Sequence, residues 1–246
     1  MAQGLEVVAG GAMGLAESRP PRAPRVLCLH SFRTSGAIFR EQCFNFSSFG
    51  AKLEAAGFEL DFPDAPYCCT PGDEEKVYPI VKEAFPTCNK YYEWYNASDD
   101  HSEYRRLDDT LAFLERYMAE HGPYDGVVGF SQGGTLAHLV SHLQASGAAF
   151  TRQPRLKFLI VLCARRSRAA AHARLWEGAP PQTLPRAMVI IGGRDDAVSP
   201  TEVRKVAETL PGARVWTVPD CAHAVPNLQP EQVRELWDFL RDASPS

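Results

Sequence analysis

The sequence lacks several features that would place the protein in a particular class. No apolar run approaches the roughly 18 residues of a membrane-spanning helix, so we expect no membrane span. There is no C-x-x-C pair and the number of cysteines, seven, is odd, which argues against a disulfide framework and for a reducing compartment. The net charge of −4 does not suggest a general nucleic-acid or membrane-surface binder.

The first residues, 1–23, lack the basic start and the continuous apolar core of a secretory signal. They are rich in Gly, Ala, Pro and Arg without usable periodicity, and we predict a flexible N-terminal tail. Glu6, Glu17 and the scarcity of serine disfavour an organelle transit peptide, which stays an open alternative. We therefore predict a cytoplasmic protein.

The rest of the chain has the composition of a globular domain with a sizeable core. Of 246 residues, 45% are hydrophobic and 23% are charged. There is neither an internal repeat nor a linker, so we predict a single domain over residues 24–246.

Short apolar runs alternate with helical patterns along this domain. We predict strands at residues 25–29, 58–62, 125–130, 158–163, 187–191 and 214–218. We predict helices at about 38–56, 102–121, 133–144, 203–210 and 231–240. This alternation indicates the α/β class, with a mostly parallel, doubly wound sheet whose ligand lies beyond the carboxyl ends of the strands.

The pattern dissolves between residues 65 and 100, where four prolines interrupt it. Aromatic side chains gather in this stretch: Tyr67, Tyr78, Phe85, Tyr91, Tyr92, Trp94 and Tyr95. A loop this long inside a compact domain usually has a function, so we predict a lid-like insertion or binding wall. An aromatic satellite core under a surface excursion is an equal and compatible interpretation.

The stretch from Val127 to Thr135 reads VVGFSQGGT and contains a G-x-S-x-G pattern. A predicted strand ends just before it, and a helical pattern begins just after it. A nucleophile elbow needs this context, because the sharp turn holds the serine in strained backbone angles above the sheet edge. Gly129 and Gly133 would let strand and helix approach closely around Ser131. An idle serine in a glycine-rich turn is the alternative.

Three polar side chains follow the ends of three predicted strands: Ser131, Asp196 and His223. Their chain order is that of the α/β-hydrolases, and the carboxyl ends of parallel strands meet at one edge. His223 would take the proton of Ser131, and Asp196 would hold the other imidazole nitrogen. The oxyanion would accept hydrogen bonds from the backbone N–H groups of Gln132 and Phe32.

Other polar residues have simpler interpretations. Asp195 or its neighbour would cap the local turn, and His30 would buttress its loop. His138 and His142 stand four apart on a helix, but no H-E-x-x-H pattern or third ligand accompanies them, so we predict no metal site. The arginines after residue 163 could bind an acidic substrate group, although a solvated helix face is the favoured interpretation. They are Arg165, Arg166, Arg168 and Arg174.

Four motifs in order resemble the FSH family of serine hydrolases over about residues 24–240: LCLHSFRTSG from Leu27, GFSQG from Gly129, DAVSP from Asp196 and HAVP from His223. The resemblance implies an α/β-hydrolase fold, a Ser-Asp-His triad and action on small-molecule esters or thioesters without a cofactor. It implies Asp196 as the acid, because the family's aspartate stands four residues before a proline, here Pro200. It also places an aromatic segment near the substrate, so we expect His30, Tyr92, Trp94 and Tyr95 around the pocket.

One position departs from that family, in which His-Gly-Phe usually stands where this chain has His30-Ser31-Phe32. Glycine permits a backbone flip that serine resists, so the departure bears on the second oxyanion donor. Two hypotheses follow. The favoured one is a serine hydrolase that forms an acyl-enzyme on Ser131, and the alternative is a ligand-binding or sensing protein on the same fold with slow or lost turnover.

Overall fold

The computed structural model describes residues 22–70, 72, 76–100, 102–178 and 180–243. The predicted tail over residues 1–23 therefore lies outside the described residues, except for its last two positions. Across the described ranges, no helix is both long and apolar enough to cross a membrane.

The centre of the molecule is a six-stranded sheet in which all neighbouring strands are parallel. From one edge to the other its strands are β10 (Arg214–Val218), β9 (Arg186–Gly192), β8 (Phe158–Leu162), β7 (Gly126–Phe130), β1 (Arg25–Leu29) and β2 (Glu59–Asp61). The chain starts at β1, one strand in from the edge, adds β2 on the outer side and then adds β7 to β10 in the opposite direction, which confirms the predicted doubly wound α/β class. Parallel order places all the carboxyl ends on one rim.

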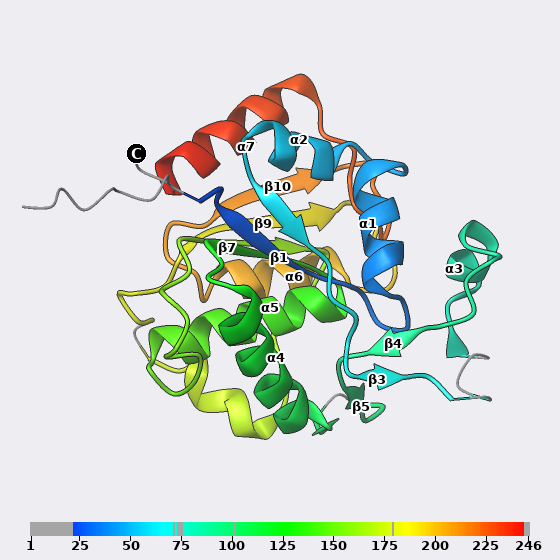
Figure 1. The fold of residues 1–246 in the computed structure, drawn as a ribbon, viewed down its shortest axis with the longest axis horizontal. Coiled ribbons are helices and arrows are strands. Elements are labelled where there is room, and N and C mark those ends of the chain that lie inside the picture. The colour runs from blue at the N-terminus through cyan, green and yellow to red at the C-terminus, as the bar shows by residue number, and fades with distance from the viewer. Residues whose placement is uncertain (1–21, 71, 73–75, 101, 179, 244–246) are drawn as a thin grey trace, which may run out of the picture.

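Helices cover both faces of the sheet (Figure 1). One face packs against α1 (Gly36–Phe44), α2 (Phe49–Ala55) and α7 (Pro230–Ala243), and the other against α4 (Leu107–His121), α5 (Gln132–Ala145) and α6 (Pro200–Ala207). Successive strand residues point to opposite faces, so β1 sends Val26 to one core and Leu27 to the other. Two buried cores explain why the strands are apolar throughout.

The stretch predicted as an insertion contains short elements beside the sheet (Figure 1). In chain order they are β3 (Tyr67–Cys68), α3 (Pro79–Ala84), β4 (Tyr92–Glu93) and β5 (Asn96–Ala97), with β6 (Tyr104–Arg105) following. The strands pair as antiparallel β3–β4 and β5–β6. A satellite core of Ile38, Val77, Val81 and Tyr91 lies under this excursion.

The helix expected at 203–210 lies at Pro200–Ala207, and two other predicted helices differ more strongly from the structure. The helix expected from residue 102 begins at Leu107, because Tyr104–Arg105 pairs as a strand and Arg106 then takes a left-handed φ of 66°. The helix expected over 38–56 is divided into α1 and α2. Helical spacing alone does not reveal these breaks, because strand pairing depends on a second segment and Arg106 adopts an unusual φ for a non-glycine residue.

His138 and His142 are buried residues of α5, and their rings pack against Trp176 at centroid distances of 4.8 and 5.0 Å. His138 Nε2 is hydrogen-bonded to the Thr209 hydroxyl at 2.8 Å, whereas the buried ring nitrogens of His142 have no partner among the described residues. No third ligating side chain joins the pair within the part of the chain that is described. Burial lowers the pKa of both rings, that of His142 to about 4.

We expect the burial of His142 to make the fold acid-sensitive. Its pKa is about 4 in the folded state against an ordinary value of 6.5, so the unfolded chain binds the proton more readily between those values. Stability should therefore fall as the pH drops from 6.5 to 4, with a contribution from this residue of up to about 3 kcal/mol. Urea unfolding midpoints measured between neutral pH and about pH 5 should show a shallower decline in His142→Leu than in the wild type.

The matched control is His121→Leu, since His121 is exposed on α4. This variant should keep the acid dependence of the wild type. An equally steep decline in all three proteins would contradict the assignment to His142.

Candidate active site

Ser131 lies in the turn between β7 and α5, with a left-handed φ of 53° and a ψ of −116°. The glycines on either side are required by close backbone approach. A Cβ on Gly133 would lie 2.1 Å from the carbonyl oxygen of Leu29, and one on Gly129 would lie 2.3 Å from that of Gly133. The turn thus has the geometry of a nucleophile elbow, in which strain fixes the serine at the rim.

His223 connects this serine to a carboxylate. Its Nε2 is 2.9 Å from Ser131 Oγ, and its Nδ1 is 2.8 Å from Asp195 Oδ2. The ring also lies against Phe130 at a centroid distance of 5.0 Å. Three loops that follow β7, β9 and β10 therefore bring their side chains into one hydrogen-bonded chain at the carboxyl rim.

The prediction that Asp196 contacts the histidine is wrong, because Asp195 does so. The side chain of Asp195 is fully buried, and its second oxygen accepts hydrogen bonds from the backbone N–H groups of Ala197 (3.0 Å) and Val198 (2.7 Å). Asp196 is exposed. The local turn and the contact with histidine were expected to need different carboxylates, but one carboxylate has two oxygens and Asp195 uses one for each.

Burial of Asp195 acts to raise its pKa, but the hydrogen bonds from His223, Val198 and Ala197 outweigh it and lower the pKa. The group is therefore ionised at neutral pH. A buried anion that faces Nδ1 favours a proton on that nitrogen, which leaves Nε2 free to accept the proton of Ser131.

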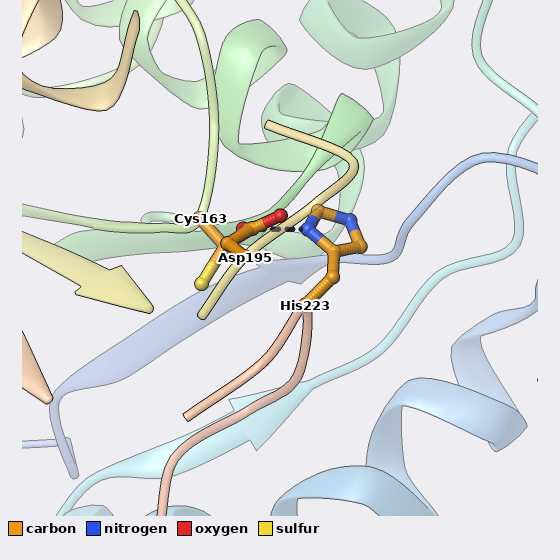
Figure 2. A group of neighbouring side chains, drawn as sticks. All are labelled: Cys163, Asp195 and His223. Carbon is orange, nitrogen blue, oxygen red and sulfur yellow. Dashed lines mark hydrogen bonds and ion pairs between the residues drawn. The ribbon is translucent and has the colours of Figure 1, made fainter. Parts of the chain in front are cut away.

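Figure 2 shows Cys163 beside Asp195 and His223. The ligand atoms of these three side chains lie within 4.8 Å of one another, which is compact enough to consider a metal ion. Burial, with the nearby charge of Asp195, raises the pKa of the Cys163 thiol. A protonated thiol is a poor ligand, and Asp195 and His223 already bond each other, so the group fits a proton relay better than a metal centre.

His30 supports the loop after β1 from beneath. Its Nδ1 is 2.7 Å from the carbonyl oxygen of Ser31, and its Nε2 accepts a hydrogen bond from the backbone N–H of Ala65 at 3.0 Å. Burial lowers its pKa to about 4, so the ring is neutral near pH 7. Trp94 adds a bond from its indole N–H to the carbonyl oxygen of His30 at 2.9 Å.

Gln132, directly after Ser131, ties the aromatic segment to the elbow. Its side-chain oxygen accepts from the backbone N–H of Trp94 at 2.9 Å, and its amide donates to the carbonyl oxygen of Tyr95 at 2.7 Å. No sequence motif announces this role, because the two partners are 38 and 37 residues away.

A cavity of about 350 Å³ opens over Ser131 and His223. Phe32, Gln132 and Tyr95 line it, as expected. The expectation for the other three pocket candidates was wrong: His30 and Trp94 are fully buried beneath the loop, and Tyr92 pairs through its backbone with Thr34. Tyr78 from the predicted aromatic wall also lines the cavity, and so does Arg165, for which the sequence leaves an acidic ligand open. The rest of the lining, which sequence patterns did not indicate, comprises Asn96, Ala97, Ser98, Asp99, Tyr104, Thr135, Ala197 and Val198.

Ser31 does not take the backbone conformation for which glycine is required. The left-handed residue of this loop is Arg33, with a φ of 50°, and its guanidinium pairs with buried Glu93 at 3.2 Å. We therefore expect Ser31→Gly to change kcat/KM on a 4-nitrophenyl ester by less than about threefold, or about 0.6 kcal/mol in the barrier. A gain of about tenfold or more in steady-state assays would show instead that Ser31 restrains the loop.

Comparison with known proteins identifies the family. The model of the family described as "Serine hydrolase (FSH1)" matches residues 20–234. The chain belongs to this family of serine hydrolases. The expected resemblance is thereby confirmed, and so is the expectation of a serine hydrolase; several relatives are named esterases.

Relatives of this FSH-family chain include "Esterase OVCA2" from Danio rerio, 28% identical over 88% of this chain and 96% of the relative. "Family of serine hydrolases 3" from Saccharomyces cerevisiae is 27% identical over 84% and 79%. A Schizosaccharomyces pombe protein named "Dihydrofolate reductase" is 26% identical over 89% of this chain, which spans only 47% of it. That name belongs to the longer protein, of which this chain matches about half.

Solved structures support the α/β-hydrolase fold. Acyl-protein thioesterase 2 from Zea mays superposes with a TM-score of 0.57 at 16% identity and covers 92% of this chain and 96% of its own. Esterase PE8 gives a TM-score of 0.56 at 20% identity, covering 90% and 93%. At these identities the likeness concerns the fold.

Proposed function

We propose that this hydrolase cleaves small carboxylic esters or thioesters through an acyl-enzyme on Ser131. The observation that carries the proposal is the chain of hydrogen bonds from Ser131 Oγ through His223 to Asp195, at 2.9 and 2.8 Å, on the floor of a cavity. Relatives named esterases and a fold neighbour named a thioesterase agree with this reaction class.

His223 acts as the general base in this scheme. Its Nε2 takes the proton from Ser131 as Oγ attacks the acyl carbon, and it then returns the proton to the departing alcohol or thiol. A water molecule repeats the sequence on the acyl-enzyme, and the carboxylic acid leaves. Asp195 holds the ring in position and stabilises the imidazolium that forms in each step.

The oxyanion accepts hydrogen bonds from the backbone N–H groups of Gln132 and Phe32 in this scheme. Both residues line the cavity that contains Ser131. Gln132 is the first residue of α5, so its N–H belongs to the helix N-terminus, where negative charge is stabilised. The reaction requires no cofactor, since both proton transfers are made by His223.

Fluorophosphonate labelling tests the proposal. The pure protein should gain one phosphonyl adduct, which peptide mapping should place on Ser131, and it should turn over members of a panel of 4-nitrophenyl esters and acyl thioesters. Folded protein that neither labels nor hydrolyses the panel would overturn the proposal and favour a ligand-binding role.

A further inference from the structure

We propose that the substrate carries a carboxylate away from the scissile bond and that Arg165 binds it. This inference rests on the proposed ester or thioester hydrolysis. Arg165 lines the same cavity as Ser131 and His223 and lies only three positions beyond the end of β8. The sequence favours a solvated helix face for this arginine, but it lines the cavity instead.

Two hydrogen bonds position Arg165 at the cavity wall, one to its backbone and one from its guanidinium. The backbone carbonyl accepts from the Thr135 hydroxyl at 2.9 Å, which ties the residue to α5 one turn beyond Ser131. One terminal nitrogen donates to the carbonyl oxygen of Ala197 at 3.0 Å. A guanidinium has five N–H donors in a planar fork, so this anchor orients it and leaves donors for a ligand.

Arg165 is half-buried but has no ion-pair partner among the residues that the structure describes. The nearby acids have other partners: Asp195 is bonded to His223, and Glu202 is paired with Lys205 at 2.5 Å. By contrast, the buried Arg33 has its carboxylate, Glu93, at 3.2 Å. The charge of Glu202 acts on Arg165 only at longer range, without a direct ion pair. A partly desolvated guanidinium that lacks a directly bonded carboxylate in a substrate cavity favours an anionic ligand.

The wall around Arg165 offers polar groups to an anion beside apolar ones. Tyr95 and Tyr104 stack at 4.5 Å, and Asn96 and Ser98 add an amide and a hydroxyl to the same lining. Asp99 also borders the cavity, but it is exposed and is not paired with Arg165. A carboxylate fits the guanidinium fork with two parallel hydrogen bonds, so short acyl or alcohol groups that end in a carboxylate are the expected class.

Matched pairs of chromogenic esters test this specificity. The mono-4-nitrophenyl ester of adipate against 4-nitrophenyl hexanoate places the carboxylate in the acyl group. The pair 5-butyryloxy-2-nitrobenzoate and 4-nitrophenyl butyrate places it in the leaving group. For each pair the readout is the ratio of kcat/KM for the anionic ester to that for the neutral ester.

In at least one pair, Arg165→Gln should lower this ratio about tenfold or more, mainly through KM, and Arg165→Lys should restore part of it. Glutamine removes the charge and keeps a polar side chain, and the backbone bond from Thr135 to Arg165 does not depend on the side chain at 165. The control is Arg166→Gln, because Arg166 lies over the Trp176 ring and should leave both ratios unchanged.

Ratios that Arg165→Gln leaves unchanged in both pairs, in an enzyme that labels at Ser131 and cleaves the neutral esters, would overturn this inference alone. Wild-type protein that neither labels nor cleaves any ester would overturn the proposed function as well. The pair whose ratio falls identifies which side of the scissile bond faces Arg165.

Discussion

Asp195→Asn should lower kcat/KM by about 10³- to 10⁴-fold while the fold is retained. The reason lies in the two oxygens of the carboxylate. Oδ1 accepts two backbone N–H groups, at 3.0 and 2.7 Å, so an asparagine must keep its oxygen there. Its amide nitrogen then faces His223 Nδ1 as a donor, which forces the ring proton onto Nε2 and removes the base that Ser131 needs.

The matched control is Asp196→Asn, one residue further along the same loop. Asp196 is exposed, and its replacement should change kcat/KM by less than about twofold. Steady-state assays on one 4-nitrophenyl ester, with circular dichroism to verify folding, compare the two variants. Should Asp196→Asn be the damaged one, His223 would have to change its partner in the working enzyme.

Ser131→Ala should reduce ester hydrolysis by more than about 10⁴-fold, to near the background rate. Removing Oγ removes the attacking atom, and neither His223 nor Asp195 can replace it as the proposed nucleophile. The thermal unfolding midpoint should change little, since the left-handed φ of 53° is imposed by the elbow and not by the hydroxyl.

Ser146→Ala, at the exposed end of α5, is the control for this substitution. It should behave as wild type in stopped assays with product quantified by chromatography. Activity of purified Ser131→Ala above about one per cent of wild type would refute an acyl-enzyme on this residue and point to direct attack by water.

Local chemistry was sufficient for much of the fold. Apolar runs marked the strands because both faces of a parallel sheet are buried, and the glycines at 129 and 133 marked the elbow because a Cβ has no space there. Ser131 and His223 could also be predicted, because of their positions relative to the strands. Each follows a strand whose carboxyl end must lie on the common rim.

Assignments that depended on remote partners needed the tertiary structure. Sequence spacing predicted Asp196 as the partner of His223, whereas in the folded turn the buried Asp195 makes this contact. An aromatic segment was correctly associated with the site, but of its three candidates only Tyr95 faces the cavity, because Trp94 supports His30 beneath the loop. Two adjacent residues of an irregular segment point in different directions, and no periodicity tells which one points inward.

The sequence by itself determined the succession of the six sheet strands along the chain, the elbow and two members of the hydrogen-bonded chain, since each is imposed by local sterics or by strand ends. Only the tertiary structure decided which carboxylate meets His223, which side chains line the cavity and that Arg165 lies among them without a direct ion pair to any described residue. These features depend on contacts between segments tens of residues apart, whose packing is set by the whole core.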